Sequence, residues 1–201
     1  MNFLAHLYLA QGDDKLMLGA LLGDFVRGRH ALWAWPAGVR NGIRLHRKID
    51  RFTDNSRQVK ALQSEFPKPF RRYSGIVIDL AFDHELARQW KDYSELPLKD
   101  FDDEIRAVLA RHEAELPEEL KRFMAYADRR GLFEAYRHED EMLFSLAGIG
   151  TRLKRANPLH QVKEIWPELK PSVASAFASF FPEVQSRVGA LRKRRSTTTG
   201  S

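Results

Sequence analysis

The sequence predicts an all-α fold from three observations: helical apolar periodicity along most of the chain, Pro and Gly at the ends of the periodic segments, and no hairpin signal. The 201 residues, 43% of them hydrophobic, are enough for one domain with a sizeable core. We therefore expect a single-domain helical bundle over residues 1–191. The basic and polar end of the chain, residues 192–201, is expected to be disordered.

The first half of the chain contains three long helical patterns, over residues 14–28, 41–56 and 73–90. Gly28 is expected near the end of the first helix, since Gly often follows a helix C-terminus. The third pattern contains a β-branched run that would suit a strand, but its length favours a helix. The second is amphipathic, with an apolar stripe formed by Leu45, Ile49 and Phe52.

The second half continues in the same style, with helices expected over residues 98–116, 117–131 and 132–155. Two or three further helices are expected after residue 158, because prolines interrupt helices and this region contains three, Pro167, Pro171 and Pro182. No internal repeat is visible, which agrees with one irregular bundle.

Composition excludes several classes of protein. The chain has no cysteine, so it has no disulfide, no thiolate nucleophile and no Cys-ligated zinc. No stretch reaches the apolar length needed to cross a bilayer. The opening "MNFLAHLYLA" lacks the basic start of a secretory signal and contains a histidine. We expect a cytoplasmic protein with no membrane partner.

The net charge of +6 is unevenly distributed. The segment 27–72 contains twelve Lys and Arg against three Asp and Glu, whereas the segment 79–141 contains eighteen acidic against ten basic residues. The tail sequence "LRKRR" adds further positive charge. A dense positive segment attracts an anionic partner in a salt-dependent way, although many of these side chains also fit an ordinary solvated helix face.

The helix expected over residues 41–56 carries His46 and Asp50 at the edge of its apolar stripe. The two residues are four apart, so they project together about 100° around the axis from the buried side chains. A His and a carboxylate in this arrangement can share a metal ion or a hydrogen bond. The edge of the core is where the wall of a pocket would lie.

Other acidic and histidine side chains also lie in apolar surroundings. Asp79 and Asp83 are four residues apart in the run "GIVIDLAFDHEL", and His84 follows directly. Asp24 lies in "GALLGDFVRG" and His6 in the apolar opening segment. Burying such groups is costly unless a cation or hydrogen-bond donors satisfy them.

Taken singly, each of these residues also fits a satisfied core histidine or a carboxylate paired with arginine. Together, three His and four Asp on four helices supply the imidazole and carboxylate ligands of Mn, Fe, Zn and Mg sites. Helical bundles that point such ligands inward are an established way to build a metal centre. We therefore predict a metal site.

A metal centre beside a basic segment indicates chemistry on a phosphate ester. A bound metal acidifies water and polarises phosphoryl oxygens, and arginines hold the remaining oxygens. Arg47, Arg71 and Arg72 are the predicted substrate-binding residues. The chain has no "GxSxG" motif and no Gly-rich phosphate loop, so we expect direct attack by water rather than a covalent intermediate.

Five collinear segments resemble the bacterial acyl carrier protein phosphodiesterase family: "MNFLAHLYLA", "GALLGDFVRGR", "GIRLHRKIDRFTD", "RRYSGIVIDLAFDHELARQW" and "FFPEV". The resemblance implies hydrolysis of the phosphodiester that joins 4′-phosphopantetheine to a serine of holo acyl carrier protein. It also implies a divalent metal, typically Mn²⁺, with Mg²⁺, Fe²⁺ or Zn²⁺ as other possibilities. It further implies an acidic protein substrate and a fold distantly similar to the helical HD phosphohydrolases.

The chain departs from the usual HD order in one respect, because its adjacent pair is reversed, Asp83 before His84. The ligands therefore cannot be transferred directly from that pattern. Asp50 and Asp79 are expected as catalytic carboxylates, either ligands or acceptors that orient the histidines. With the resemblance, the predicted metal ligands are His6, Asp24, His46, Asp83 and His84.

Three alternative functions remain. The first is a metal-dependent nucleotide phosphohydrolase, which the charge distribution fits almost as well. The second is a non-enzymatic helical module that binds nucleic acid through residues 27–72 and the tail, which leaves the buried acids without a purpose. The third is a scaffold that binds acyl carrier protein without cleaving it. We favour the phosphodiesterase and expect no nucleic-acid partner.

Overall fold

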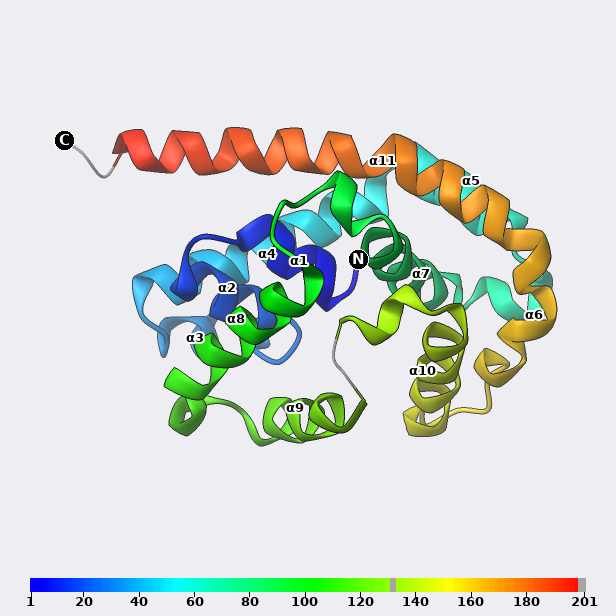
Figure 1. The fold of residues 1–201 in the computed structure, drawn as a ribbon, viewed down its shortest axis with the longest axis horizontal. Coiled ribbons are helices and arrows are strands. Elements are labelled where there is room, and N and C mark those ends of the chain that lie inside the picture. Colours follow the sequence, from blue (N-terminus) through cyan, green and yellow to red (C-terminus); the bar gives the residue numbers. More distant parts are fainter. Residues whose placement is uncertain (131–132, 199–201) are drawn as a thin grey trace.

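The computed structural model describes residues 1–130 and 133–198. In these ranges the chain forms α-helices and short 3₁₀ turns and no strand (Figure 1), which confirms the predicted all-α class. The helices are α1 (Phe3–Ala10), α2 (Asp14–Leu22), α3 (Gly28–Trp33), α4 (Ala37–Asn55), α5 (Arg57–Glu65), α6 (Lys68–Arg71), α7 (Ser74–Arg88), α8 (Leu98–Arg111), α9 (Glu118–Arg130), α10 (Glu139–Arg152) and α11 (Val162–Thr198).

The centre of the molecule is built around α1 and α7, both of which are almost wholly buried. Figure 1 shows α1, α2 and α4 together in one half of the molecule, α7 and α10 in the other, and α11 along one edge. Aromatic side chains fasten α11 to the centre: Phe177 packs edge-on against Phe82 of α7, and Phe181 lies against Tyr8 of α1. This burial of large aromatic rings holds the long outer helix in place.

Helices α2 and α4 cross unusually closely because glycines face each other at the crossing. A Cβ atom added at Gly19 would lie 2.1 Å from the carbonyl oxygen of Val39, and one added at Gly42 would lie 2.3 Å from that of Leu16. Neither helix backbone can move aside, so a larger residue at either position would force the two helices apart.

The helix expected over residues 14–28 ends early. Helix α2 stops at Leu22, whose carbonyl accepts hydrogen bonds from the backbone N–H groups of Phe25 and Val26, so the chain turns here. Gly28 has a φ of 79° and begins α3 rather than ending α2. This conformation favours glycine, and it separates the two helices.

Helix α11 also differs from the prediction. Two or three helices were expected, but one helix runs from Val162 to Thr198 with all three prolines inside it, and Figure 1 shows it bent rather than broken. Each proline removes one backbone hydrogen bond, but the buried apolar face of the helix keeps the segments joined. Residues 192–198, expected to be disordered, continue this helix, and residues 199–201 lie outside the described part.

The third departure concerns the segment expected to be one helix over residues 132–155. A 3₁₀ turn occupies Ala135–Arg137, and α10 begins only at Glu139.

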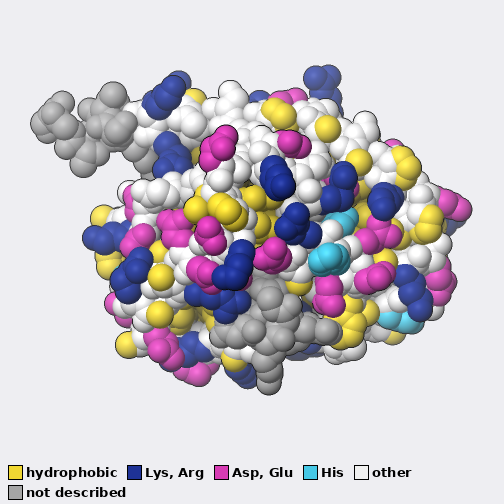
Figure 2. Space-filling model, viewed as in Figure 1, with side chains coloured by type: hydrophobic (Ala, Val, Ile, Leu, Met, Phe, Trp, Pro, Cys, Tyr) yellow, Lys and Arg dark blue, Asp and Glu magenta, His cyan; other side chains and the backbone are white. Residues whose placement is uncertain are grey.

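On the face of the molecule in Figure 2, Lys and Arg side chains are intermixed with Asp and Glu. The uneven charge along the sequence therefore does not give this face a single sign.

Candidate metal centre

His46 is fixed in orientation by helix α2. Its Nδ1 lies 2.8 Å from the carbonyl oxygen of Ala20, and since a carbonyl only accepts, Nδ1 carries the proton and donates it. The ring passes over Gly23, where an added Cβ atom would lie 2.1 Å from the ring. The side chain is buried, and its Nε2 is directed away from α2 toward two carboxylates.

The two carboxylates belong to Asp50, one turn further along α4, and to Asp24, in the turn after α2. The Nε2 atom of His46 lies 3.0 Å from Oδ2 of Asp50 and 3.3 Å from Oδ1 of Asp24. Both acids reach the surface, with 38% of the Asp50 side chain and 54% of the Asp24 side chain exposed. The cluster is therefore open to solvent on its acidic side.

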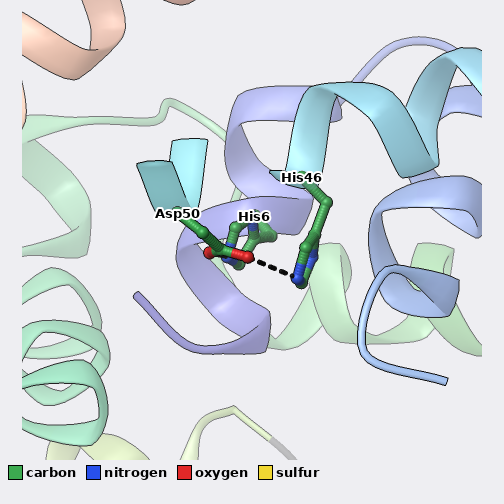
Figure 3. Close-up of side chains that lie close together, drawn as sticks. All are labelled: His6, His46 and Asp50. Carbon is green, nitrogen blue, oxygen red and sulfur yellow. Dashed lines mark ion pairs between the residues drawn. The ribbon is translucent and has the colours of Figure 1, made fainter. Parts of the chain in front are cut away.

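His6 of helix α1 completes the cluster from the opposite direction. Its Nε2 lies 3.1 Å from Oδ1 of Asp50, so this carboxylate bridges the two histidines. The rings of His6 and His46 stack with centroids 3.8 Å apart, as Figure 3 shows from the side. Nε2 of His6 also lies 3.1 Å from the carbonyl oxygen of Met1, which only accepts, so Nε2 carries the proton in this structure. Nδ1 of His6 is buried without a hydrogen-bond partner in the described part of the chain.

This arrangement fits a divalent cation. Ligand atoms of His6, His46 and Asp50 all lie within 4.8 Å of one another, and the shortest separations are 3.0 and 3.1 Å. Neighbouring ligands around a metal with bonds of about 2.1 Å are themselves about 3 Å apart. The bond from Nδ1 of His46 to a backbone carbonyl is also the usual way in which a metal-binding histidine is oriented.

The electrostatics of the cluster favour a positive charge within it. Burial lowers the pKa of His46, but hydrogen bonds to Asp24 and Asp50 outweigh this and raise it to about 9. Burial and the neighbouring His46 lower the pKa of His6 to about 4. Burial opposes ionisation of Asp50, yet its bonds to both histidines hold its pKa well below the usual range. A cation would take the place of the proton on His46.

Comparison with known proteins places this chain in a family. Residues 1–184 match the sequence model of the family described as acyl carrier protein phosphodiesterase. The chain belongs to this family. A protein named acyl carrier protein phosphodiesterase from Enterobacter sp. (strain 638) is 36% identical over 191 residues, covering 92% of this chain and 95% of the relative.

Two further relatives with the same name support the assignment. The one from Klebsiella pneumoniae is 34% identical over 92% of this chain and 95% of its own length. The one from Salmonella agona (strain SL483) is 33% identical over 93% of this chain and 97% of its own length. No solved structure matches the chain significantly. Within the described residues, no helix is long and apolar enough to cross a membrane.

Of the predicted metal ligands, Asp83 and His84 do not join the cluster. Asp83 is buried and accepts the backbone N–H groups of Leu4, at 2.8 Å, and Ala5, at 3.1 Å, so it caps the N-terminus of α1. His84 donates from Nδ1 to the carbonyl oxygen of Tyr136, at 2.7 Å. Both side chains hold the fold around the site, and neither lies beside His46.

Asp79 and Arg47, two other predicted site residues, form their contacts with groups outside the cluster. Asp79 forms an ion pair with the α-ammonium group of Met1, at 2.6 Å. Arg47 donates to the carbonyl oxygen of Val26, at 2.6 Å, and so secures the turn that carries Asp24. Arg47 is therefore linked to the cluster through the backbone of this turn.

Two predicted substrate-binding arginines lie elsewhere. Arg71 belongs to α6 and donates to the carbonyl oxygen of Ser64, at 3.2 Å, and Arg72 follows directly. Figure 1 places α6 beyond α7, away from α1 and α4. The structure does not bring these two residues to the cluster.

We expect Gly23→Ala to weaken metal binding, because its methyl group would overlap the His46 ring. The affinity for Mn²⁺, measured by calorimetric titration, should fall by about 10- to 100-fold, as for other changes that disturb ligand orientation. Gly189→Ala is the matched control, since a Cβ atom there meets nothing within 4 Å. It should leave Mn²⁺ binding unchanged and stabilise α11 by about 0.5–1 kcal/mol. Unchanged affinity in Gly23→Ala would show that His46 is not held as described.

Asp83 predicts a pH dependence of stability. Burial raises its pKa to about 7 despite the two backbone hydrogen bonds. A carboxyl with a raised pKa contributes stability below its unfolded value of about 4, and this contribution is lost as the pH rises through 7. The free energy of unfolding of the native protein, compared with that of Asp83→Asn, should therefore fall between pH 4 and 7 by at most about 1.4 kcal/mol per pH unit. Urea unfolding of both proteins at several pH values measures it, and a constant difference would contradict the assignment.

Proposed function

We propose that the protein is a metal-dependent phosphodiesterase that acts on holo acyl carrier protein and yields apo acyl carrier protein and 4′-phosphopantetheine. The observation that carries the proposal is the His6–His46–Asp50 cluster in a member of the acyl carrier protein phosphodiesterase family. Histidine and carboxylate ligands suit Mn²⁺, and Mg²⁺, Fe²⁺ and Zn²⁺ are the other candidates. We place the reaction in the cytoplasm, with the carrier protein as partner and no nucleic acid.

The residues of the cluster have distinct parts in this proposal. His6, His46 and Asp50 would hold the ion, and Asp24 would be a fourth ligand at the exposed side where substrate and water enter. When bound, the ion would supply positive charge to the phosphoryl oxygens and acidify a water molecule. Water adds its oxygen to phosphorus, the P–O bond to serine breaks, and the serine oxygen takes up a proton.

The positioning of these groups depends on buried hydrogen bonds. The carbonyl oxygen of Ala20 holds the His46 ring, and Arg47 holds the turn that carries Asp24. Neither residue needs to touch the substrate for the reaction to depend on it. Held in this way, the ligands are organised before the substrate arrives, which lowers the cost of reaching the transition state.

The test is an incubation of the purified protein with holo acyl carrier protein and Mn²⁺, followed by intact mass spectrometry of the carrier. We expect the mass of the prosthetic group to be lost with Mn²⁺ and retained with a chelator. His46→Ala and Asp50→Asn should each lower the rate by at least about 100-fold and release the metal.

His84→Asn is the discriminating control, since His84 was a predicted ligand but lies outside the cluster. It should keep both metal content and cleavage once circular dichroism shows that it is folded. Loss of metal in His84→Asn, or its retention in His46→Ala, would contradict the assigned site. No cleavage by folded, metal-loaded protein would leave a nucleotide phosphohydrolase or a binding protein as the function.

A further inference from the structure

We propose that the outer face of α4 and the groove between α4 and α11 form the docking surface for an acidic protein segment with an apolar face, and this rests on the proposed protein substrate. The surface consists of a row of cations on α4, the exposed ring of Trp33 and an apolar groove. The three parts are contiguous because the Trp33 ring and the groove both contact side chains of α4.

The cations are spaced by the helical repeat. Arg44, Lys48 and Arg51 follow one another at intervals of four and three residues, so they share one face of α4. At about 100° per residue, that face lies about 150° around the axis from the one that carries His46 and Asp50. A partner held by this row would therefore contact a different face of α4 from the one that carries the metal cluster.

Trp33 extends the surface beyond the N-terminal half of α4. Its side chain is 62% exposed, although it is a large apolar group. The guanidinium groups of Arg40 and Arg44 lie over the ring at 4.8 and 5.7 Å from its centroid. Trp and Arg are both enriched among the residues that contribute most to binding between proteins.

The groove lies on the other side of the row and has a volume of about 390 Å³. Its floor is apolar and combines side chains of α4 and α11, including Phe52, Val188 and Leu191. Its charged lining residues are all cationic, Lys48, Arg187 and Arg194. The guanidinium of Arg187 lies 4.1 Å from the centroid of the Phe52 ring, which places a positive charge directly over the floor.

This combination selects one kind of partner. Carboxylates complement the cations, and only a segment with apolar side chains next to those carboxylates would also fill the floor. A nucleic acid would match the cations but would leave the apolar floor exposed. A second copy of the chain would bring two cationic faces together, which opposes a symmetric contact.

The docking site and the metal cluster share one rigid helix. The cation row, the groove, and the pair His46 and Asp50 occupy different faces of α4. A carrier protein seated on the row and groove would therefore be held at a fixed position relative to the cluster.

The test measures binding and cleavage separately. Lys48→Glu combined with Arg187→Glu should weaken binding of fluorescent apo acyl carrier protein by at least about 30-fold at low salt, because each change puts like charges together. The KM for holo carrier should rise similarly, with kcat nearly unchanged. Hydrolysis of bis(4-nitrophenyl) phosphate, which needs no docking, should remain as in the native protein and shows that the cluster is intact.

Lys60→Glu combined with Lys163→Glu is the matched control, because both lysines are exposed, lie outside the surface and change the net charge equally. This control should bind the carrier as the native protein does. Leu191→Gln, which alters the floor without changing charge, should weaken binding by about fivefold.

Several results would overturn the proposal. These are no binding by the native protein, equal loss of binding in the control pair, or no loss in the Lys48 and Arg187 pair. Equally tight binding of a 20-base-pair DNA at the same surface would assign the surface to nucleic acid. If the native protein sediments as a dimer and the Lys48 and Arg187 variant does not, the surface would be assigned to self-association. Native protein that binds the carrier through this surface but does not cleave it would refute the proposed function alone.

Discussion

The close crossing of α2 and α4 is the constraint on which the rest of the site depends. Gly19 and Gly42 allow the two backbones to approach within a distance that any Cβ atom would prevent. At this separation the carbonyl oxygen of Ala20 accepts a hydrogen bond from Nδ1 of His46. Gly23, at the end of the same helix, leaves room for the imidazole ring. Three glycines thus fix the orientation of one candidate metal ligand.

A second constraint brings His6 to the same place. Helix α1 is short and almost wholly buried, so its free N-terminal N–H groups need acceptors. Asp83 of α7 provides them and thereby fixes α1 against α7. The rings of His6 and His46 then stack, and Asp50 reaches both. Asp83, which the sequence suggests as a metal ligand, therefore serves the site by holding the helix that carries His6.

The sequence predicts what local periodicity determines and misses what distant contacts determine. The all-α class and the pairing of His46 with Asp50 follow from spacings within single helices. The role of Asp83 depends on residues 79 positions away, and an apolar run with a buried acid looks the same whether the partner is a metal or a backbone N–H. The sequence predicts helix ends near Pro167, Pro171 and Pro182, but packing against α7 keeps α11 continuous. The aromatic spacing in α11 was a signal of that packing.

Helix α4 unites the two proposals because its three faces have different chemistry. One face holds His46 and Asp50, a second holds the cations, and a third provides Ile49 and Phe52 to the groove beside α11. A substrate that is both a phosphodiester and a protein needs a metal for its reactive group and a separate surface for its body. A single rigid helix that carries both fixes the distance between them. Under these two proposals, specificity for a protein-bound diester over a free one would arise from the docking face, and the chemistry from the cluster.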